Sequence, residues 1–237
     1  MTQDTSPGAL HDHVLTTVGT RIATGALTEG DVLTLDGICT EYAVSRTLAR
    51  EAIRVLESMG LVTSRRRVGI TVQPATHWNV FDPRLIRWRL DGDGRAEFLV
   101  TLSELRRGVE PAAAALAAER GDDHHCRVLA AAASDMAIAA RTGDQQSYLL
   151  ADKLFHQNLL AAGGNEMFRA LTGVVDEVLA GRTHHGMMPE TPNPVAIALH
   201  DDVARAIRLG DPGAAETAMR AIVDEAAQAV HDRPTTD

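Results

Sequence analysis

The chain has 237 residues, of which 45% are hydrophobic and only 3% aromatic, and its formal net charge is −9. This length allows one large or two modest domains, each able to bury a core of its own. Two cysteines are too few for a disulfide framework, and no apolar stretch is long enough to span a membrane, so the composition argues against secreted disulfide-rich and membrane proteins and favours a cytoplasmic one.

The charge is distributed unevenly along the chain. Acidic and basic residues nearly cancel in residues 1–75, so almost all of the excess negative charge falls in the remainder. An acidic body with a locally basic edge would attract an anionic polymer to that edge and repel it elsewhere. The negative net charge is therefore compatible with binding to nucleic acid.

The first part of the chain is predicted to form short helices and strands. Apolar residues recur at helical spacing over residues 9–24, and residues 32–34 are a candidate strand. A short helix is predicted over residues 36–42, with Asp36 able to cap its start and a two-residue turn after it.

The next predicted helix, from Ser45 to Met59, carries the main functional signal. Arg46, Arg50 and Arg54 are four residues apart on a face that does not carry the apolar stripe. Three guanidinium groups in such a row would repel one another without an anionic partner. Two short helices with a tight turn, the second presenting a basic row, form the arrangement in which a recognition helix enters the DNA major groove.

A hairpin is predicted after Gly60, which ends this helix. Strands at residues 61–63 and 70–72 flank a loop that contains three consecutive arginines. Such a loop would reach phosphates or the minor groove beside the helix. The alternative is a solvated arginine face without a binding role, and it predicts no salt-sensitive DNA binding.

These residues resemble the winged helix-turn-helix of GntR-type bacterial transcription regulators. The resemblance rests on Val44–Thr47, Arg50–Ala52, Gly60–Val62 and a Gly-x-x-Val hairpin. Many relatives carry an arginine where this chain has Asp36, which makes the arginines of the wing more important. The resemblance implies that double-stranded DNA is contacted by Ser45, Arg46, Thr47, Arg50, Arg54, Arg65, Arg66, Arg67 and Gly69.

A linker is predicted over residues 75–94, between a DNA-binding domain (residues 1–74) and an effector-binding and dimerisation domain (residues 95–237). It contains both tryptophans, Trp78 and Trp88. Large aromatic residues in a connector usually dock on another surface. Two alternatives follow: these side chains set the angle between the domains, or they contact a partner subunit.

From residue 95 onward the pattern is helical throughout. Pro111 is expected to open a new helix, and glycines separate most of the others. The expected helices are at about 95–109, 111–120, 122–141, 144–162, 165–180, 194–209 and 211–231. The predicted fold is therefore mainly α, with an N-terminal winged helix-turn-helix followed by an antiparallel all-α helical bundle.

Polar residues inside the predicted bundle indicate what it could bind. Asp152 and His156 are four apart in one predicted helix and could hold one divalent metal ion, although such a pair is more often only hydrogen-bonded; His200 opens a later helix. Arg106 would either bind the carboxylate of an effector in a bidentate fork or form a surface ion pair with Glu110 one turn later.

The bundle resembles the helical FCD-type effector domain of the FadR branch of GntR regulators, in residues 102–119, 152–165 and 200–219. Residues 78–90 are similar to a subgroup that responds to sugar acids such as galactonate. Metal-binding members line their cavity with an Asp and three His, and the family often places a cavity-facing arginine at the position of Arg106. Asp152, His156 and His200 match three of the four metal positions, and Ile222 falls at the fourth. The resemblance thus implies an incomplete zinc site, finished by water or by oxygens of the effector.

Together these features predict a homodimeric regulator, a repressor that binds a palindromic operator and senses a sugar acid or another small carboxylate. Dimerisation is expected because one recognition helix reads only a few base pairs. A metal-dependent enzyme using the bundle is the alternative, but the sequence supplies no general base, and no catalytic residue is assigned. A third hypothesis is an architectural DNA binder with a purely structural bundle, and it predicts that no small acid raises the melting temperature of the protein.

Overall fold

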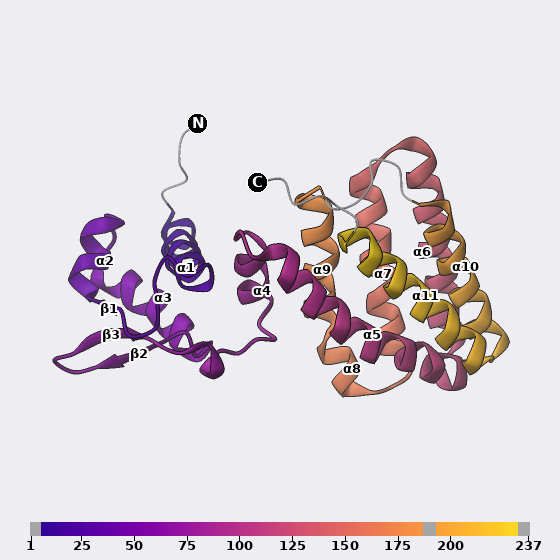
Figure 1. Ribbon diagram of the computed structural model, residues 1–237, viewed down its shortest axis with the longest axis horizontal. Helices are drawn as coiled ribbons and strands as arrows, with labels where there is room; N and C mark the ends of the chain where they lie inside the picture. Colours follow the sequence, from indigo (N-terminus) through magenta and orange to yellow (C-terminus); the bar gives the residue numbers. More distant parts are fainter. Residues whose placement is uncertain (1–5, 187–192, 232–237) are drawn as a thin grey trace. The chain divides into compact units, whose positions relative to one another are not determined.

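The computed structural model describes residues 6–186 and 193–231, and the chain divides into two compact units, residues 1–95 and 96–237. Most of the described chain is helical, and the first unit also holds a small three-stranded sheet (Figure 1). The predicted mainly α fold, with a winged helix-turn-helix before an all-α helical bundle, is confirmed. None of the described helices is both long and apolar enough to cross a membrane.

The first unit packs α1 against α3 and α4, with the sheet beside α3. The sheet is antiparallel in the order β1-β3-β2, and Val62 pairs with Val72 while Arg65 pairs with Gly69. The elements are α1 (Pro7–Ala23), β1 (Val32–Leu33), α2 (Leu35–Glu41), α3 (Arg46–Ser58), β2 (Val62–Arg65), β3 (Gly69–Val72), the 3₁₀ helix η1 (Ala75–His77) and α4 (Pro83–Leu90).

Side-chain caps fix the start of both helices of the helix-turn-helix. The hydroxyl of Thr34 accepts a hydrogen bond from the backbone N–H of Gly37 at 3.0 Å, so α2 starts at Leu35. The prediction that Asp36 caps this helix is therefore wrong, because Asp36 already lies in its first turn. Ser45 caps α3 by accepting from the N–H of Leu48 at 3.3 Å, as expected from the sequence.

Gly60 ends α3 with a left-handed backbone, at φ +76°. A Cβ atom at this position would lie 2.1 Å from the backbone oxygen of His77. Glycine is therefore required both for the backbone conformation and for the close approach of the segment that follows the sheet.

Both tryptophans pack into the hydrophobic core of the first unit. Trp88 is buried on α4 against Gly19 of α1, where an added Cβ would lie 2.3 Å from the indole ring. Trp78 is partly buried, and its indole N–H donates to the carbonyl of Gln73 at 3.0 Å. The surface on which these two residues dock is thus the first unit itself.

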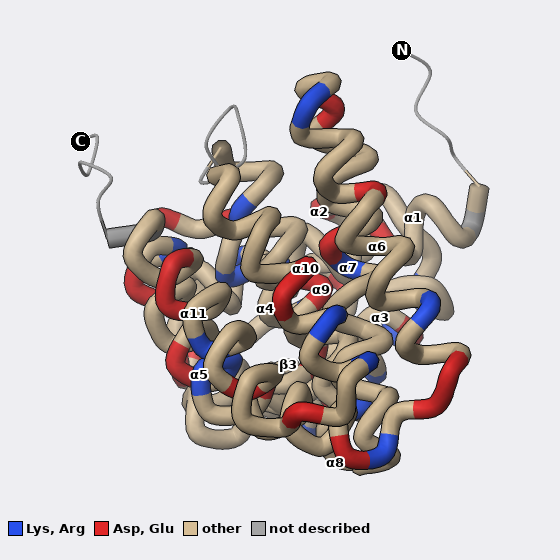
Figure 2. Tube along the Cα trace, turned by 90° about the vertical axis from the view of Figure 1, so that its right-hand side faces the viewer, with Lys and Arg blue, Asp and Glu red and all other residues tan. Residues whose placement is uncertain are grey.

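The second unit is a helical bundle in which α7 packs against both α6 and α9, and α10 packs against both α6 and α11. Asp and Glu residues lie on several of its helices, with Lys and Arg between them (Figure 2). The helices are α5 (Arg95–Arg120), α6 (Asp123–Thr142), α7 (Gln145–Ala162), α8 (Glu166–Ala170), α9 (Thr172–His184), α10 (Pro194–Leu209) and α11 (Pro212–His231).

Two of the predicted helix boundaries in the bundle are wrong. The sequence predicts a break at Pro111, yet α5 continues through it. A proline inside a helix costs about 3 kcal/mol, and burial of Ala113, Ala114 and Ala117 just beyond it offsets that cost by packing. The single helix predicted over residues 165–180 is instead α8 and α9, which meet at Leu171.

Candidate DNA-binding surface and ligand site

The arginines of α3 lie on its exposed face. Arg46, Arg50 and Arg54 are exposed, whereas the opposite face of the helix is buried in the core of the first unit. Arg46 has a carboxylate neighbour on α2, because its Nη2 lies 3.2 Å from Oδ1 of Asp36. Exposed pairs of this kind contribute little to stability and exchange readily for other anions. The row is therefore accessible to a partner outside the fold.

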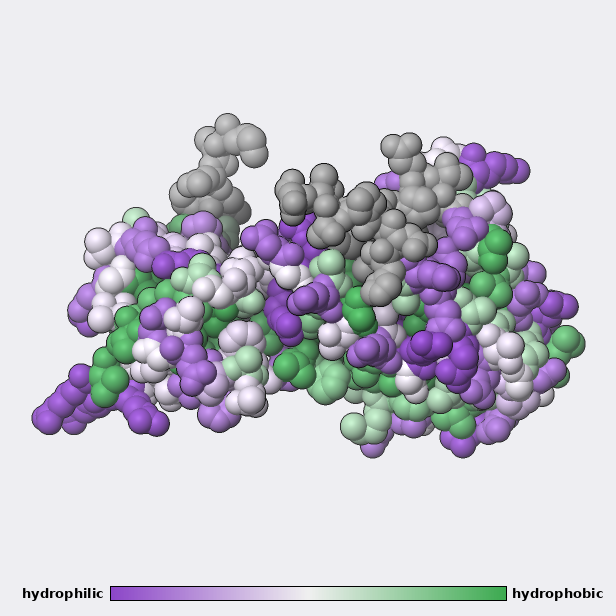
Figure 3. Space-filling view, in the orientation of Figure 1, coloured by the Kyte–Doolittle hydropathy of each residue, from purple (hydrophilic) through white to green (hydrophobic). Residues whose placement is uncertain are grey.

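The wing presents its three arginines at the tip of the β2–β3 hairpin. Arg65, Arg66 and Arg67 are all exposed, and Figure 3 shows a strongly hydrophilic hairpin tip. Arg67 has a positive φ of +68°, which closes the turn. The wing is tied to α3 by Glu57, whose Oε1 accepts a hydrogen bond from the backbone N–H of Ser64 at 2.6 Å. Sequence patterns gave no signal for this contact of Glu57.

Three further residues expected at the DNA surface have different positions in the structure. Thr47 is exposed in the first turn of α3, next to the arginine row. The hydroxyl of Ser45 is used as the helix cap. Gly69 is partly buried at the start of β3, and a Cβ there would lie 2.8 Å from the carbonyl oxygen of Leu33. The structure thus gives Ser45 and Gly69 a folding role at this surface.

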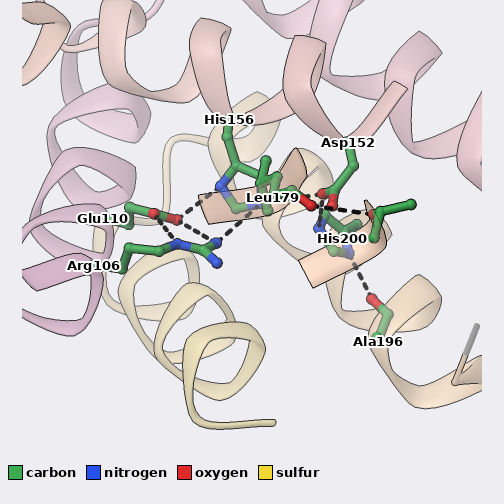
Figure 4. Close-up of polar contacts among 8 residues, drawn as sticks. Arg106, Glu110, Asp152, His156, Leu179, Ala196 and His200 are labelled. Carbon is green, nitrogen blue, oxygen red and sulfur yellow. Dashed lines mark hydrogen bonds and ion pairs between the residues drawn. The ribbon is translucent and has the colours of Figure 1, made fainter. Parts of the chain in front are cut away.

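In the second unit, Asp152, His156 and His200 come together although the last lies on a different helix. Asp152 Oδ1 is 3.3 Å from Nε2 of His156, on the same helix α7, and 3.4 Å from Nε2 of His200 on α10. All three side chains are buried, and one potential ligand atom of each lies within 4.8 Å of the others (Figure 4). Spacing along the sequence predicted only Asp152 and His156 as neighbours, because they are four residues apart on one helix.

The hydrogen bonds of this cluster leave two acceptor atoms facing each other. Nδ1 of His200 lies 2.7 Å from the carbonyl oxygen of Ala196, and it must donate because a carbonyl can only accept. In the neutral imidazole, Nε2 is then an acceptor that faces Asp152 Oδ1, and neither atom has a hydrogen-bond partner. A cation between two buried acceptors removes this conflict, and a carbonyl that orients a histidine is typical of metal sites. The donor set fits a divalent metal ion.

Arg106 is buried and already has a carboxylate partner. Its Nε lies 2.5 Å from Oε1 of Glu110, and its Nη2 lies 3.2 Å from Oε2 of the same side chain. Of the two alternatives for Arg106, the ion pair with Glu110 is present, but it is buried rather than at the surface. Glu110 Oε2 also lies 2.7 Å from Nδ1 of His156, outside hydrogen-bonding geometry, so this contact is electrostatic (Figure 4).

These buried charges determine the ionisation of one another. Burial alone would raise the pKa of Glu110, but Arg106 and His156 hold it well below its usual value. The pKa of Asp152 is likewise low, because His156 and His200 outweigh the effect of burial. Burial disfavours charge on His156, but Glu110 and Asp152 raise its pKa to about 9. The cluster is therefore built around charged carboxylates.

Ile222, at the fourth position of the expected metal set, is buried on α11 among apolar residues of the core. An aliphatic side chain offers no ligand atom. Any metal bound here would have three protein ligands and would keep positions open for other oxygen atoms.

Comparison with known proteins gives a consistent result for both units. Residues 10–72 match the family described as bacterial regulatory proteins, gntR family, and residues 101–225 match the FCD domain. The chain is similar to the galactonate operon transcriptional repressor of Escherichia coli (strain K12), with 28% identity over 214 residues that cover 90% of this chain and 93% of the relative.

Solved structures show the same fold at lower identity. Lar of Listeria monocytogenes has a TM-score of 0.59 and 18% identity, covering 94% of this chain and 97% of its own. A GntR protein of Streptococcus agalactiae has a TM-score of 0.52 and 22% identity, covering 92% of this chain and 99% of its own.

Proposed function

The chain belongs to the GntR family of bacterial regulatory proteins and carries an FCD domain, and from this premise we propose that it is a homodimeric repressor of an operon for a sugar acid or another small carboxylate. As a ligand-responsive DNA-binding regulator, it would act in the cytoplasm. The observation that carries the proposal is the exposed row of Arg46, Arg50 and Arg54 on a capped helix with a basic wing beside it.

We propose that α3 enters the major groove of a palindromic operator. Arg46 and Arg50 would contact bases and phosphates, Thr47 the backbone or a base, and Arg54 a phosphate. The wing arginines would follow the adjacent groove or backbone. Because Asp36 and Glu51 pair with arginines of α3 in the absence of DNA, phosphates would replace these carboxylates on binding.

The effector site is proposed to lie at the buried cluster of the bundle. Asp152, His156 and His200 would hold a divalent metal ion, with zinc the best match to one carboxylate and two imidazoles. Such an ion supplies a Lewis-acidic centre that oxygens of a hydroxy acid can ligate. Arg106 adds positive charge beside it, and the relative that represses a galactonate operon suggests a sugar acid as the ligand.

A thermal-shift experiment with galactonate, with and without zinc, tests the sensor function. We expect stabilisation that grows with ligand concentration, by about 2.7 kcal/mol at one hundred times Kd, because ligand bound only to the folded state shifts unfolding by mass action. An architectural DNA binder would show no shift with this or any other small acid.

Metal uptake tests the site itself. Zinc bound per chain, measured by elemental analysis after dialysis, should fall to background in His156→Ala. His184→Ala is the control, because His184 is exposed at the end of α9. Equal uptake by His156→Ala and the wild type would remove the proposed site.

The alternative of a metal-dependent enzyme needs a general base beside the metal. Glu110 is a carboxylate in contact with the cluster, but its ion pair with Arg106 keeps its pKa low and makes it a weak base. Nothing in this geometry favours catalysis over sensing. Turnover of galactonate by the purified protein with added zinc would reverse this conclusion.

A further inference from the structure

Arg182 is a buried cation that lacks a full set of acceptors. It lies in the last turn of α9, and only 7% of its surface is exposed. Its Nε has no hydrogen-bond partner, and no ion pair to its guanidinium occurs within the described residues. A buried charged donor without an acceptor is destabilising. The position therefore favours an anion that the described part of the chain does not provide.

Arg182 lies on α9 about one turn after a residue that is drawn with the metal cluster. Leu179, three residues earlier on the same helix, is drawn among the cluster residues in Figure 4, and residues three apart on a helix are neighbours. α9 packs against α7, which carries Asp152. Tyr148 is buried one turn before Asp152. Burial and the charge of Asp152 raise the pKa of its phenol, and the charge of Arg182 opposes this rise.

The charges around Arg182 also favour an anionic partner. Burial lowers the pKa of Arg182, and the like charge of Arg106 lowers it further, whereas Asp152 and Glu225 raise it. Within the described residues neither acid forms an ion pair with Arg182: Asp152 lies against the two histidines, and Glu225 accepts a hydrogen bond from Asn193 at 2.9 Å.

Arg106 and Arg182 differ in what they can offer a ligand. Arg106 already directs Nε and Nη2 to Glu110, so a new carboxylate could form the same two-point contact only by displacing a buried partner. Arg182 has an unused Nε donor in a desolvated setting, where a charge-assisted hydrogen bond is strong. The guanidinium of the cluster whose Nε donor is unused is therefore the one on α9.

We propose that Arg182 binds the carboxylate of the effector, while the metal site takes oxygens from its hydroxyl groups. The ligand class is then a polyhydroxy monocarboxylate, and the neutral polyol of the same length should be rejected. This inference rests on the proposed sensor function, because it assigns one residue within that ligand site.

The competing explanation is that Arg182 has only a structural role. The two explanations predict opposite signs for Arg182→Met, which keeps a long apolar side chain but removes the charge. A ligand-binding arginine buried without a partner destabilises the free protein, so Met should raise or preserve the melting temperature without ligand. A structural arginine would lower it on replacement.

The experiment measures melting temperatures of the full chain with zinc, alone and with galactonate or galactitol. For Arg182→Met we expect an equal or higher melting temperature without ligand, unchanged zinc uptake, and about tenfold or more weaker galactonate binding. Arg182→Lys should bind galactonate more weakly than the wild type but more tightly than Arg182→Met, since lysine keeps the charge but cannot form the bidentate contact of a guanidinium. Arg107→Met is the control, because Arg107 is exposed and pairs with Asp224, and it should behave as the wild type.

Different outcomes separate this inference from the proposed function. If the wild type responds to galactonate and Arg182→Met responds equally, or if Arg182→Met melts earlier without ligand, Arg182 is structural and the inference fails while the sensor function stands. If galactitol stabilises the wild type as well as galactonate does, no carboxylate is recognised and the inference fails. If no sugar acid stabilises the wild type, both fall together.

Discussion

Asp36 places a negative charge where the DNA backbone is expected. It sits in the first turn of α2 and pairs with Arg46, and both side chains are exposed. We expect Asp36→Ala to bind random-sequence duplex more tightly, by about two- to fivefold, because a repulsive charge is removed and Arg46 is released. Fluorescence anisotropy at two salt concentrations measures this. Asp12→Ala, an exposed acid on α1, is the control, and weaker binding by Asp36→Ala would show that the carboxylate instead positions Arg46.

Ala43 holds a strained backbone in the turn between α2 and α3. Its φ is +52°, in the left-handed region that costs a residue with a Cβ about 1 kcal/mol relative to glycine. We expect Ala43→Gly to raise the free energy of unfolding by about that amount and Ala43→Val to lower it. Urea denaturation followed by tryptophan fluorescence is the right measurement, because both tryptophans lie in the first unit. A loss of stability in Ala43→Gly would show that this turn is not strained.

The contribution of the wing to DNA binding can be measured from the salt dependence of the affinity. Replacing Arg65, Arg66 and Arg67 with alanine should weaken binding to all duplexes and reduce the slope of log affinity against log salt by about 0.9 for each phosphate that is no longer neutralised. A matched variant removes three exposed arginines of the second unit, Arg107, Arg205 and Arg208, and should keep the full slope. Equal slopes for the two triple variants would mean that the wing does not touch DNA.

Elements defined by local rules could be predicted from the sequence, and those decided by packing could not. The side-chain cap of Ser45 starts α3, and the left-handed backbone of Gly60 ends it; both features depend on a few adjacent residues. Pro111 follows an equally sound local rule, yet the burial of its neighbours overrides it and α5 continues. A local rule therefore holds only where tertiary packing does not oppose it.

The same limit applies to the ligand site. Asp152 and His156 could be identified together because a helix places residues four apart on one face. The ion pair of Arg106 with Glu110 is one of two alternatives that the sequence predicts, but its burial and its approach to His156 depend on how α5 and α7 pack. Arg182 could not be identified from the sequence, because the lack of an acceptor for its Nε arises only once the bundle has formed.

For the molecule as a whole, metal removal should affect the two units differently. EDTA is expected to lower the melting temperature of the second unit by about 5–10 °C, because loss of an ion near saturation removes a few kcal/mol. Circular dichroism should follow this change, while the tryptophan signal of the first unit should move less. Asp152→Asn should make the protein insensitive to EDTA. If EDTA leaves both melting transitions of the wild type unchanged, the bundle is not stabilised by a metal ion.

The central claim is that the arginine row of α3 meets DNA, and one titration tests it most directly. The affinities of the wild type, Arg50→Ala and Arg107→Ala are compared by anisotropy on a duplex from upstream of the protein's own gene and on a scrambled duplex. The account predicts that Arg50→Ala loses about 1–3 kcal/mol on the upstream duplex and less on the scrambled one, while Arg107→Ala binds as the wild type does. Unchanged binding of the upstream duplex by Arg50→Ala would contradict it.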